Sequence, residues 1–260
     1  MGAYGIELSY FILANARASA FGAYLLFVLL LTHFVPVPFV HTYDTIFIAA
    51  VGHQFVALAS GREAWREFVV IAVFHMLATI MELFKTHPAI GSWAYPDVST
   101  AIFAIGTVPL FTGFLYSAVG SYISRAIRYL HLYYVRMPAQ YHVWVASALI
   151  YINFFTHHVI YDARYIILVY LLYIFGRTTI YFKVYTQTRR LPFLVAGLLT
   201  AICIWIAENI GTFAHVWLYP NQTVAWHMVS VEKIGSWFLL LILSFALVSL
   251  IYRDRITHGD

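Results

Sequence analysis

The sequence has few charged residues and almost no cysteine. Asp, Glu, Lys and Arg make up 10% of its 260 residues, whereas hydrophobic residues make up 62%. Soluble domains usually contain about 25% charged residues, so this composition excludes an ordinary soluble domain and indicates an integral membrane protein. The single cysteine, Cys203, excludes an intrachain disulfide.

The sequence also lacks the signatures of nucleotide chemistry. It contains no Walker loop, no dinucleotide-binding glycine fingerprint and no Gly-x-Ser-x-Gly elbow, so we expect no nucleotide cofactor. The formal net charge is +4, but the basic residues concentrate between apolar stretches. We interpret this charge as an orientation signal in a membrane, and we expect no nucleic-acid partner.

Eight apolar stretches predict eight transmembrane helices. They cover residues 18–35, 45–60, 68–84, 98–123, 143–160, 165–182, 191–210 and 229–252. Lipid offers no hydrogen-bond partner to an open backbone, so such stretches are expected to be helical. The expected fold is therefore all-α, a polytopic membrane helix bundle. Residues 1–17, which precede it, form either a short interfacial helix or a loose terminus.

The basic residues divide unequally between the two sides of the predicted membrane domain. Twelve of the fifteen Lys and Arg residues fall on the side that holds both termini and the linker at residues 124–142. Because Lys and Arg favour the cytoplasmic side, we expect residues 1–17, the linker and the tail at residues 253–260 to be cytoplasmic.

The chain carries one set of polar and aromatic motifs twice. THFVPVPFVHTYD (Thr32–Asp44) corresponds to THHVIYD (Thr156–Asp162), and MELFKTHPAIGSWAYPD (Met81–Asp97) corresponds to AENIGTFAHVWLYPN (Ala207–Asn221). Thr32 and Thr156 are 124 positions apart (156 − 32), as are Tyr95 and Tyr219 (219 − 95). This constant spacing predicts two parallel four-helix repeats, residues 18–123 and 143–252, related by a pseudo-twofold axis along the membrane normal.

Two glutamates, Glu82 and Glu208, occupy matched positions at the outer ends of predicted helices. A carboxylate at the centre of a bilayer costs roughly 2.5 to 3.5 kcal/mol on insertion scales, and less near the interface. Two interpretations of the pair stay open. Each carboxylate either crosslinks helices through a neighbouring His or Tyr, or acts as a general acid or base.

Histidines and aspartates repeat beside these glutamates. His33 and His157 end the first predicted helix of each half, and Asp44 and Asp162 begin the second. Imidazole and carboxylate bind divalent metals, so these four residues are candidate metal ligands as well as catalytic partners. Their spacing matches no recognised metal motif, and hydrogen-bonding histidines are the alternative. We expect six side chains to line one outer-facing cavity: His33, Asp44, Glu82, His157, Asp162 and Glu208.

Four aromatic residues repeat within Trp-x-Tyr-Pro strings, namely Trp93, Tyr95, Trp217 and Tyr219. Tyr and Trp concentrate at membrane interfaces, and Pro stiffens turns, so these strings predict structural corners whose rings also line the cavity. Glu232 and Lys233 have no charged counterpart in the first half. Either a buried ionic partner for the opposite half or an exposed pair at the rim explains them.

The string MELFKTHPAIGSWAYPD, in a chain of this length, resembles the YoaT-like family of bacterial integral membrane proteins. The resemblance implies a protein of the bacterial inner membrane and supplies no catalytic residues. A shorter string, ENIGTF followed by an aromatic-rich turn (Glu208–Tyr219), is similar to the Glu-x-x-Gly pattern of membrane carotenoid hydratases.

Three classes of function are compatible with these features. The first is a membrane enzyme that acts by proton transfer on a lipid-soluble substrate, an isoprenoid or acyl lipid, because acid/base groups lie at a lipid-accessible depth. The second is a transporter with a central polar site between the two halves, and the third is a non-enzymatic membrane scaffold. Bound metal would favour the ligand hypothesis, and a co-purifying polyene would favour isoprenoid chemistry.

Overall fold

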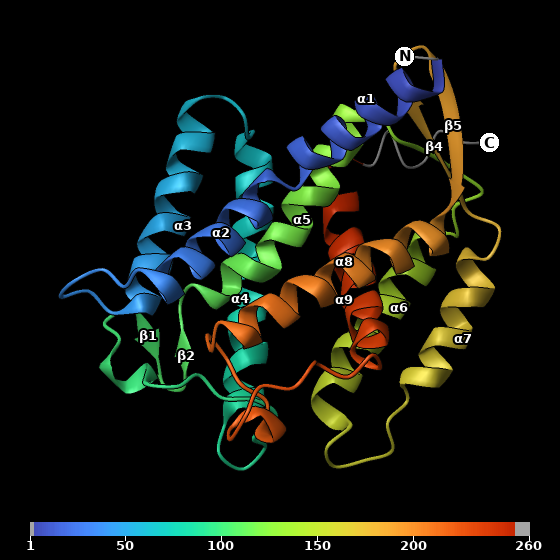
Figure 1. The fold of residues 1–260 in the computed structure, drawn as a ribbon. Helices are drawn as coiled ribbons and strands as arrows, with labels where there is room; N and C mark the ends of the chain where they lie inside the picture. The colour runs from blue at the N-terminus through green and yellow to red at the C-terminus, as the bar shows by residue number, and fades with distance from the viewer. Residues whose placement is uncertain (1–2, 253–260) are drawn as a thin grey trace. The chain divides into compact units, whose positions relative to one another are not determined.

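The computed structural model describes residues 3–252, which are mainly helical (Figure 1). The helices are α1 (Ala3–Ala18), α2 (Ala20–Phe34), α3 (Thr42–Ala59), α4 (Trp65–Thr86), α5 (Thr112–Tyr129), α6 (Gln140–Thr156), α7 (Arg164–Phe175), α8 (Phe193–Phe213) and α9 (Lys233–Ser249). The strands are β1 (Ala104–Ile105), β2 (Val108–Pro109), β3 (Tyr133–Val135), β4 (Thr179–Val184) and β5 (Gln187–Pro192). The tail at residues 253–260 lies outside the described residues.

Two of the described helices, α4 and α8, are long and apolar enough to cross a membrane. A third span exists if α1 and α2, which are separated by Ser19, count as one broken span. The 22 residues of α4 extend about 33 Å, which matches a hydrocarbon core of about 30 Å. Each of the eight predicted stretches overlaps one of the helices α2 to α9, but eight transmembrane helices are not confirmed.

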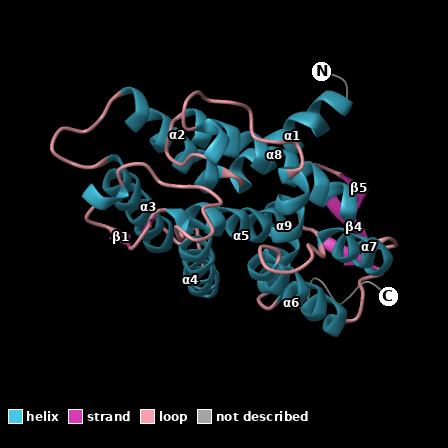
Figure 2. Ribbon diagram, turned by 90° about the horizontal axis from the view of Figure 1, so that it is seen from below, coloured by secondary structure: helices cyan, strands magenta, loops and turns pink. Residues whose placement is uncertain are grey.

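The fold is mainly helical, as expected, but short strands accompany the helices (Figure 2). The fourth apolar stretch does not begin a helix at residue 98. It forms a 3-10 turn (Val98–Thr100) and the β1–β2 hairpin before α5 begins at Thr112. Ile105 pairs with Val108 across a two-residue loop in which Gly106 has a φ of 58°. Such loops require positive φ, which glycine adopts without strain.

A second sheet, with the order β3-β4-β5, is antiparallel and joins the predicted linker to the end of the sixth apolar stretch. That stretch leaves its helix at Phe175 and continues as β4, with the sequence TIYFKV. β-Branched and aromatic residues favour strands. The sixth apolar stretch was assigned to one helix by its overall hydropathy, so the short alternation of apolar residues at its end, in β4, was not recognised as a strand.

The chain forms two compact units. The first comprises residues 3–20, 120–202 and 234–252, and the second comprises residues 21–119 and 203–233. Each unit therefore draws on both halves of the sequence, because the end of α8 and the following loop belong with the helices of the first half. The predicted repeats at residues 18–123 and 143–252 stay a prediction.

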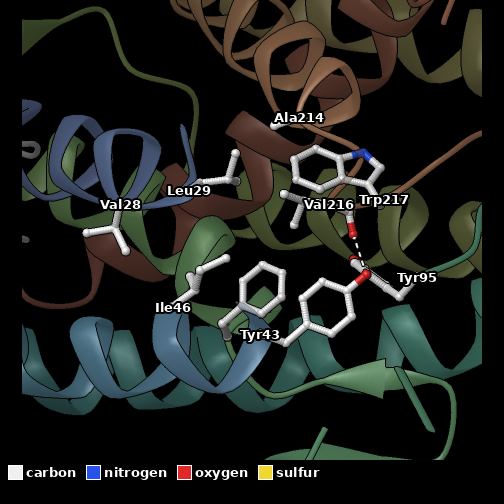
Figure 3. Packing of buried hydrophobic residues seen from close by; sticks show 9 residues of the cluster. Val28, Leu29, Tyr43, Ile46, Tyr95, Ala214, Val216 and Trp217 are labelled. Atoms are coloured by element: carbon white, nitrogen blue, oxygen red, sulfur yellow. Dashed lines mark hydrogen bonds between the residues drawn. The ribbon is translucent and has the colours of Figure 1, made fainter. Parts of the chain in front are cut away.

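The core of the second unit gathers around Tyr43 and Trp217 (Figure 3). Its buried members are Val28, Leu29, Tyr43, Ile46, Tyr95, Phe111, Ala214, Val216 and Trp217. The Tyr43 hydroxyl lies 2.6 Å from the carbonyl oxygen of Pro96 and 3.0 Å from that of Val216. The Tyr43 side chain on α3 thus bonds to both the loop that follows α4 and the loop that follows α8.

Candidate active site

The two Trp-x-Tyr-Pro segments pair with each other inside the second unit. Ala94 and Leu218 form an antiparallel bridge in which each backbone N–H donates to the other's carbonyl at 2.9 Å. The ring centroids of Trp93 and Tyr219, which flank this bridge, are 6.1 Å apart. The pairing brings together segments that follow Glu82 on α4 and Glu208 on α8.

Glu82 accepts three side-chain hydrogen bonds. Its Oε2 accepts hydrogen bonds from Nε1 of Trp93 and from the hydroxyl of Tyr95, both at 2.8 Å, and its Oε1 accepts one from the hydroxyl of Tyr116 at 2.7 Å. Only 2% of Glu82 is exposed. Buried carboxylates need such donors, because an unpaired charge in an apolar setting is costly.

Glu208 occupies the same cluster from the end of α8. Only 5% of it is exposed, and its Oε1 accepts a hydrogen bond from the Tyr219 hydroxyl at 2.5 Å. The Lys233 ammonium lies 4.5 Å from the centroid of the Tyr219 ring and 5.6 Å from that of Trp93. An ammonium at this distance from an aromatic face is attracted by the ring quadrupole.

The pKa values of Tyr95 and Tyr219 are affected by the neighbouring carboxylates of Glu82 and Glu208. Burial raises the pKa of Tyr219 well above its ordinary value, and the charge of Glu208, its hydrogen bond and the charge of Glu82 act in the same direction. Burial and then the charge of Glu82 likewise raise the pKa of Tyr95. Both phenols therefore keep their protons at neutral pH and serve as donors. Tyr219 bonds to Glu208, and its ring lies 6.1 Å from that of Trp93, which bonds to Glu82, so contacts link the two carboxylates into one group.

We call this group the glutamate cluster. It consists of two carboxylates, four aromatic donors and one ammonium: Glu82, Trp93, Tyr95, Tyr116, Glu208, Tyr219 and Lys233. All seven residues belong to the second unit. The arrangement has the groups that proton transfer needs, because carboxyl groups exchange protons and the neighbouring donors stabilise negative charge.

Trp217 packs in the same hydrophobic core as Tyr95 of the glutamate cluster. It is 9% exposed and packs in the core beside Tyr43. A β-carbon at Gly211 would lie 2.1 Å from Cη2 of Trp217, so the close approach of the indole to α8 requires glycine. Trp217 is therefore a packing residue, whereas Trp93, Tyr95 and Tyr219 contact the carboxylates or the ammonium.

Asp44 has a structural role in the second unit. Its two carboxylate oxygens accept hydrogen bonds from the backbone N–H groups of Ile102 (2.9 Å) and Phe103 (2.8 Å). These bonds tie the start of α3 to the segment before β1. Asp44 is 2% exposed, and these two partly buried hydrogen bonds satisfy both of its carboxylate oxygens.

His33 is exposed at the end of α2, where it contacts aromatic neighbours. Its ring centroid lies 4.9 Å from that of Phe34, 6.2 Å from that of Phe213 and 6.1 Å from that of His215. The structure thus surrounds Glu82 with tyrosines and tryptophan where the sequence suggested histidine as the partner.

His157 and Asp162 belong to the first unit. Asp162 accepts hydrogen bonds from the Asn153 amide at 3.1 Å and from Nε of Arg164 at 2.6 Å. Partial burial opposes ionisation of Asp162, but the Arg164 backbone N–H, Asn153 and the Arg164 guanidinium together lower its pKa. Nδ1 of His157 lies 2.8 Å from the carbonyl oxygen of Asn153. Both residues stabilise the turn between α6 and α7, and the glutamate cluster is built without them.

Among residues 3–252, no group of three or more His, Cys, Asp or Glu side chains is placed to hold a metal ion. The interpretation of His33, Asp44, His157 and Asp162 as metal ligands stays a prediction.

Sequence comparison places the chain in a family. A model described as "Protein of unknown function (DUF817)" matches residues 7–245. The uncharacterized protein YoaT of Bacillus subtilis (strain 168) is 38% identical over 235 residues, which cover 90% of this chain and 88% of YoaT. The chain belongs to the DUF817 family. The resemblance to YoaT-like proteins is confirmed, and no solved structure matches the chain.

A search for repeated motifs does not identify two members of the glutamate cluster of this DUF817 protein, Tyr116 and Lys233. Tyr116 lies within α5 in a string of apolar residues, and Lys233 begins α9 with no counterpart in the first half. The sequence could nonetheless have identified Lys233, because a charged residue at the start of an apolar stretch is expected to interact with a partner group. It could not have identified Tyr116, because tyrosine is common throughout this chain.

Proposed function

We propose that this DUF817 protein is a membrane enzyme that moves protons to and from a lipid-soluble substrate, with Glu82 and Glu208 as its acid and base. One observation carries this proposal. Two buried carboxylates, one from each helix long enough to span a membrane, meet in a single cluster with an ammonium and four aromatic donors. Intramembrane ionisable residues that converge in this way mark functional sites.

The chemistry that suits this pair is the shift of a double bond. One carboxyl group gives its proton to one carbon of the double bond, which leaves positive charge on the other, and the second carboxylate removes a proton from the next carbon along the chain, so that a new double bond forms there. The double bond moves by one position, the substrate keeps its composition, and the two glutamates exchange protonation states. No oxidant, reductant or nucleotide is needed. The Tyr95, Tyr116 and Tyr219 hydroxyls stabilise whichever carboxylate is ionised.

The substrate class follows from the surroundings of the site. The carboxylates lie at the ends of two apolar helices, and aromatic rings surround them. An isoprenoid or acyl chain carries carbon–carbon double bonds and dissolves in the bilayer beside such helices. The aromatic side chains beside the carboxylates support this choice, since aromatic faces stabilise positive charge that develops on carbon.

We further propose that helices α2 to α9 all cross the bacterial inner membrane, with both termini in the cytoplasm and the glutamate cluster in a cavity near the outer face. The overlap of these helices with the eight apolar stretches supports the count. The Ala94–Leu218 bridge supports the duplication, because antiparallel pairing of two matched strings is what a twofold axis between copies produces. The uneven distribution of basic residues supports the orientation.

Proton transfer to carbon can be tested before the substrate is identified. The purified protein is incorporated into vesicles of bacterial lipid extract in deuterium oxide, and the lipids are then analysed by mass spectrometry for deuterium at carbon. We expect one lipid class to gain deuterium with the native protein but not with Glu82→Gln or Glu208→Gln, because Gln preserves the shape of Glu but exchanges no proton at working pH.

A matched control is Glu232→Gln, which removes an exposed carboxylate beside Lys233. This variant should retain deuterium incorporation within about twofold of the native rate. If no lipid class gains deuterium with the folded native protein, or if Glu82→Gln is as active as Glu232→Gln, the proposed function is rejected.

A structural crosslink is the second candidate role, and the three donors to Glu82 favour it. A carboxylate with both oxygens bonded holds α4 to α5 and to the following loop. In that case Glu82→Gln would lower the thermal unfolding temperature markedly, because the amide group replaces one acceptor with a donor. The catalytic proposal expects loss of exchange with nearly native stability.

A further inference from the structure

The small sheet of the first unit has two different faces. Side chains alternate between the faces of a strand, so Tyr134, Ile180 and Val184 share one face and are all buried. On the same face of the sheet, the ring of Phe182 lies 5.5 Å from that of Phe11 on α1, and Nη2 of Arg189 lies 2.6 Å from the Glu7 carboxylate. Helix α1 therefore covers part of this inner face.

The other face is open and combines aromatic and basic side chains. Tyr133 pairs with Tyr181, which pairs with Arg190, so these three residues form one row across the sheet. The rings of Tyr133 and Tyr181 stack with centroids 5.0 Å apart, and Tyr133 is 42% exposed. Lys183 and Arg190 are both exposed. We call Tyr133, Tyr181, Lys183 and Arg190 the basic sheet face.

The basic sheet face lies close to a point where the chain enters the membrane. Strand β5 ends at Pro192, and the candidate span α8 begins at Phe193. Arg190 is three residues before Phe193, so its backbone is within about 10 Å of the start of the span. Strand β4 likewise begins four residues after the apolar helix α7 ends at Phe175.

We propose that the basic sheet face binds the headgroups of anionic phospholipids, an inference that rests on the membrane insertion of α8 proposed above. Tyrosine rings partition to the headgroup region, and Lys and Arg near a membrane surface attract anionic lipid. The sheet joins segments that the distribution of basic residues places in the cytoplasm, on the leaflet where anionic lipids provide negative charge. Charge complementarity thus selects a phospholipid headgroup as the occupant.

The test compares two lipids that differ only in headgroup charge. Full-length protein in neutral detergent is titrated with dioctanoyl phosphatidylglycerol or dioctanoyl phosphatidylcholine, and the thermal unfolding temperature gives an apparent Kd for each. We expect phosphatidylglycerol to bind at least about tenfold more tightly. Each cation near the surface contributes about a fivefold change in affinity, so Lys183→Gln with Arg190→Gln should weaken phosphatidylglycerol binding about 10- to 30-fold.

The matched control is Arg62→Gln with Arg66→Gln, which removes two other exposed basic residues from the side predicted to be cytoplasmic, one before α4 and one in its first turn. It should retain phosphatidylglycerol affinity within about twofold. Raising the salt concentration should weaken phosphatidylglycerol binding to the native protein, and this test needs no substitution.

Three results would overturn the inference: equal affinity for the two lipids, equal stabilisation by inorganic phosphate, or an equal loss in the Arg62 and Arg66 control. Glu82→Gln should leave phosphatidylglycerol binding unchanged. Loss of deuterium exchange and loss of lipid selectivity are therefore separate outcomes, and either proposal can fail alone.

Discussion

Ala94 and Leu218 exchange two backbone hydrogen bonds of 2.9 Å across 124 positions of sequence (218 − 94). This reciprocal pair is the point at which the two Trp-x-Tyr-Pro segments meet. It places Trp93 beside Tyr219 and so brings together the aromatic residues that follow Glu82 on α4 and Glu208 on α8. The pairing explains why the polar and aromatic strings recur together, since each supplies part of one cluster.

Substitution of Gly211 by Ala should destabilise the second unit. The new β-carbon would lie 2.1 Å from Cη2 of Trp217, and the rigid indole is packed in the core. We expect a loss of about 1 to 3 kcal/mol, as for overpacking elsewhere, seen as a lower thermal unfolding temperature in detergent. Gly52→Ala is the matched control, because nothing lies within 4 Å of its β-carbon. It should be neutral or slightly stabilising, and equal losses for the two variants would contradict this packing.

Asp44→Ala should reduce stability without changing metal content. It removes the acceptor of the Ile102 and Phe103 N–H groups, and a hydrogen bond to a charged group contributes about 1.5 to 3 kcal/mol. Asp44→Asn keeps one acceptor oxygen and should lose less. Thermal unfolding and elemental analysis of the purified variants measure the two quantities. A normally stable Asp44→Ala protein that has lost a stoichiometric metal would reverse the assignment.

Lys233→Gln should slow the proposed proton transfer. Its ammonium lies 4.5 Å from the Tyr219 ring centroid, and removal of one preorganised charge from a site commonly costs about 100-fold in rate. Lys233→Arg keeps both the charge and the interaction with the rings, so it should retain more of the initial rate of deuterium incorporation. Equal rates for Lys233→Gln and the native protein would remove Lys233 from the mechanism.

The proposed orientation predicts a defined labelling pattern. In a Cys203→Ala background, cysteine at Ala94 should react with an impermeant thiol reagent applied to intact cells. Cysteine at Thr257, which lies outside the described residues, should react only after the cells are broken. The reverse pattern would reject cytoplasmic termini.

The sequence predicted the centre of the candidate site through repetition. Glu82, Glu208, Trp93, Tyr95 and Tyr219 were identified because polar and aromatic residues recur at nearly the same spacing, 124 positions for the tyrosines (219 − 95) and 126 for the glutamates (208 − 82), in a chain that otherwise avoids polarity. Convergence of side chains is a property of tertiary packing, however. Asp44 and Asp162 repeat as faithfully as the glutamates, yet Asp44 binds the backbone before β1 and Asp162 binds Arg164.

Helix positions followed from hydropathy, but strands did not. The segment TIYFKV in β4 and the turn at Gly106 both lie within apolar runs that predicted helix. In β4, Ile180, Phe182 and Val184 alternate with Thr179, Tyr181 and Lys183, but this short alternation continues directly from the apolar helix α7 and was included in one long apolar stretch. Hydropathy alone also gave eight spans where length and composition of the observed helices support two or three.

The pairing of the two motifs can be measured most directly with a disulfide. Residues that exchange both hydrogen bonds in an antiparallel pair have α-carbons about 5.5 Å apart, within the range that a disulfide spans. In a Cys203→Ala background, Ala94→Cys with Leu218→Cys should therefore form an intramolecular bond under mild oxidation, seen as a reduction-sensitive shift on a denaturing gel. The single variants should show no such shift. Reduced thiols after oxidation, or only crosslinked dimers, would contradict the adjacency of the two segments and with it the glutamate cluster.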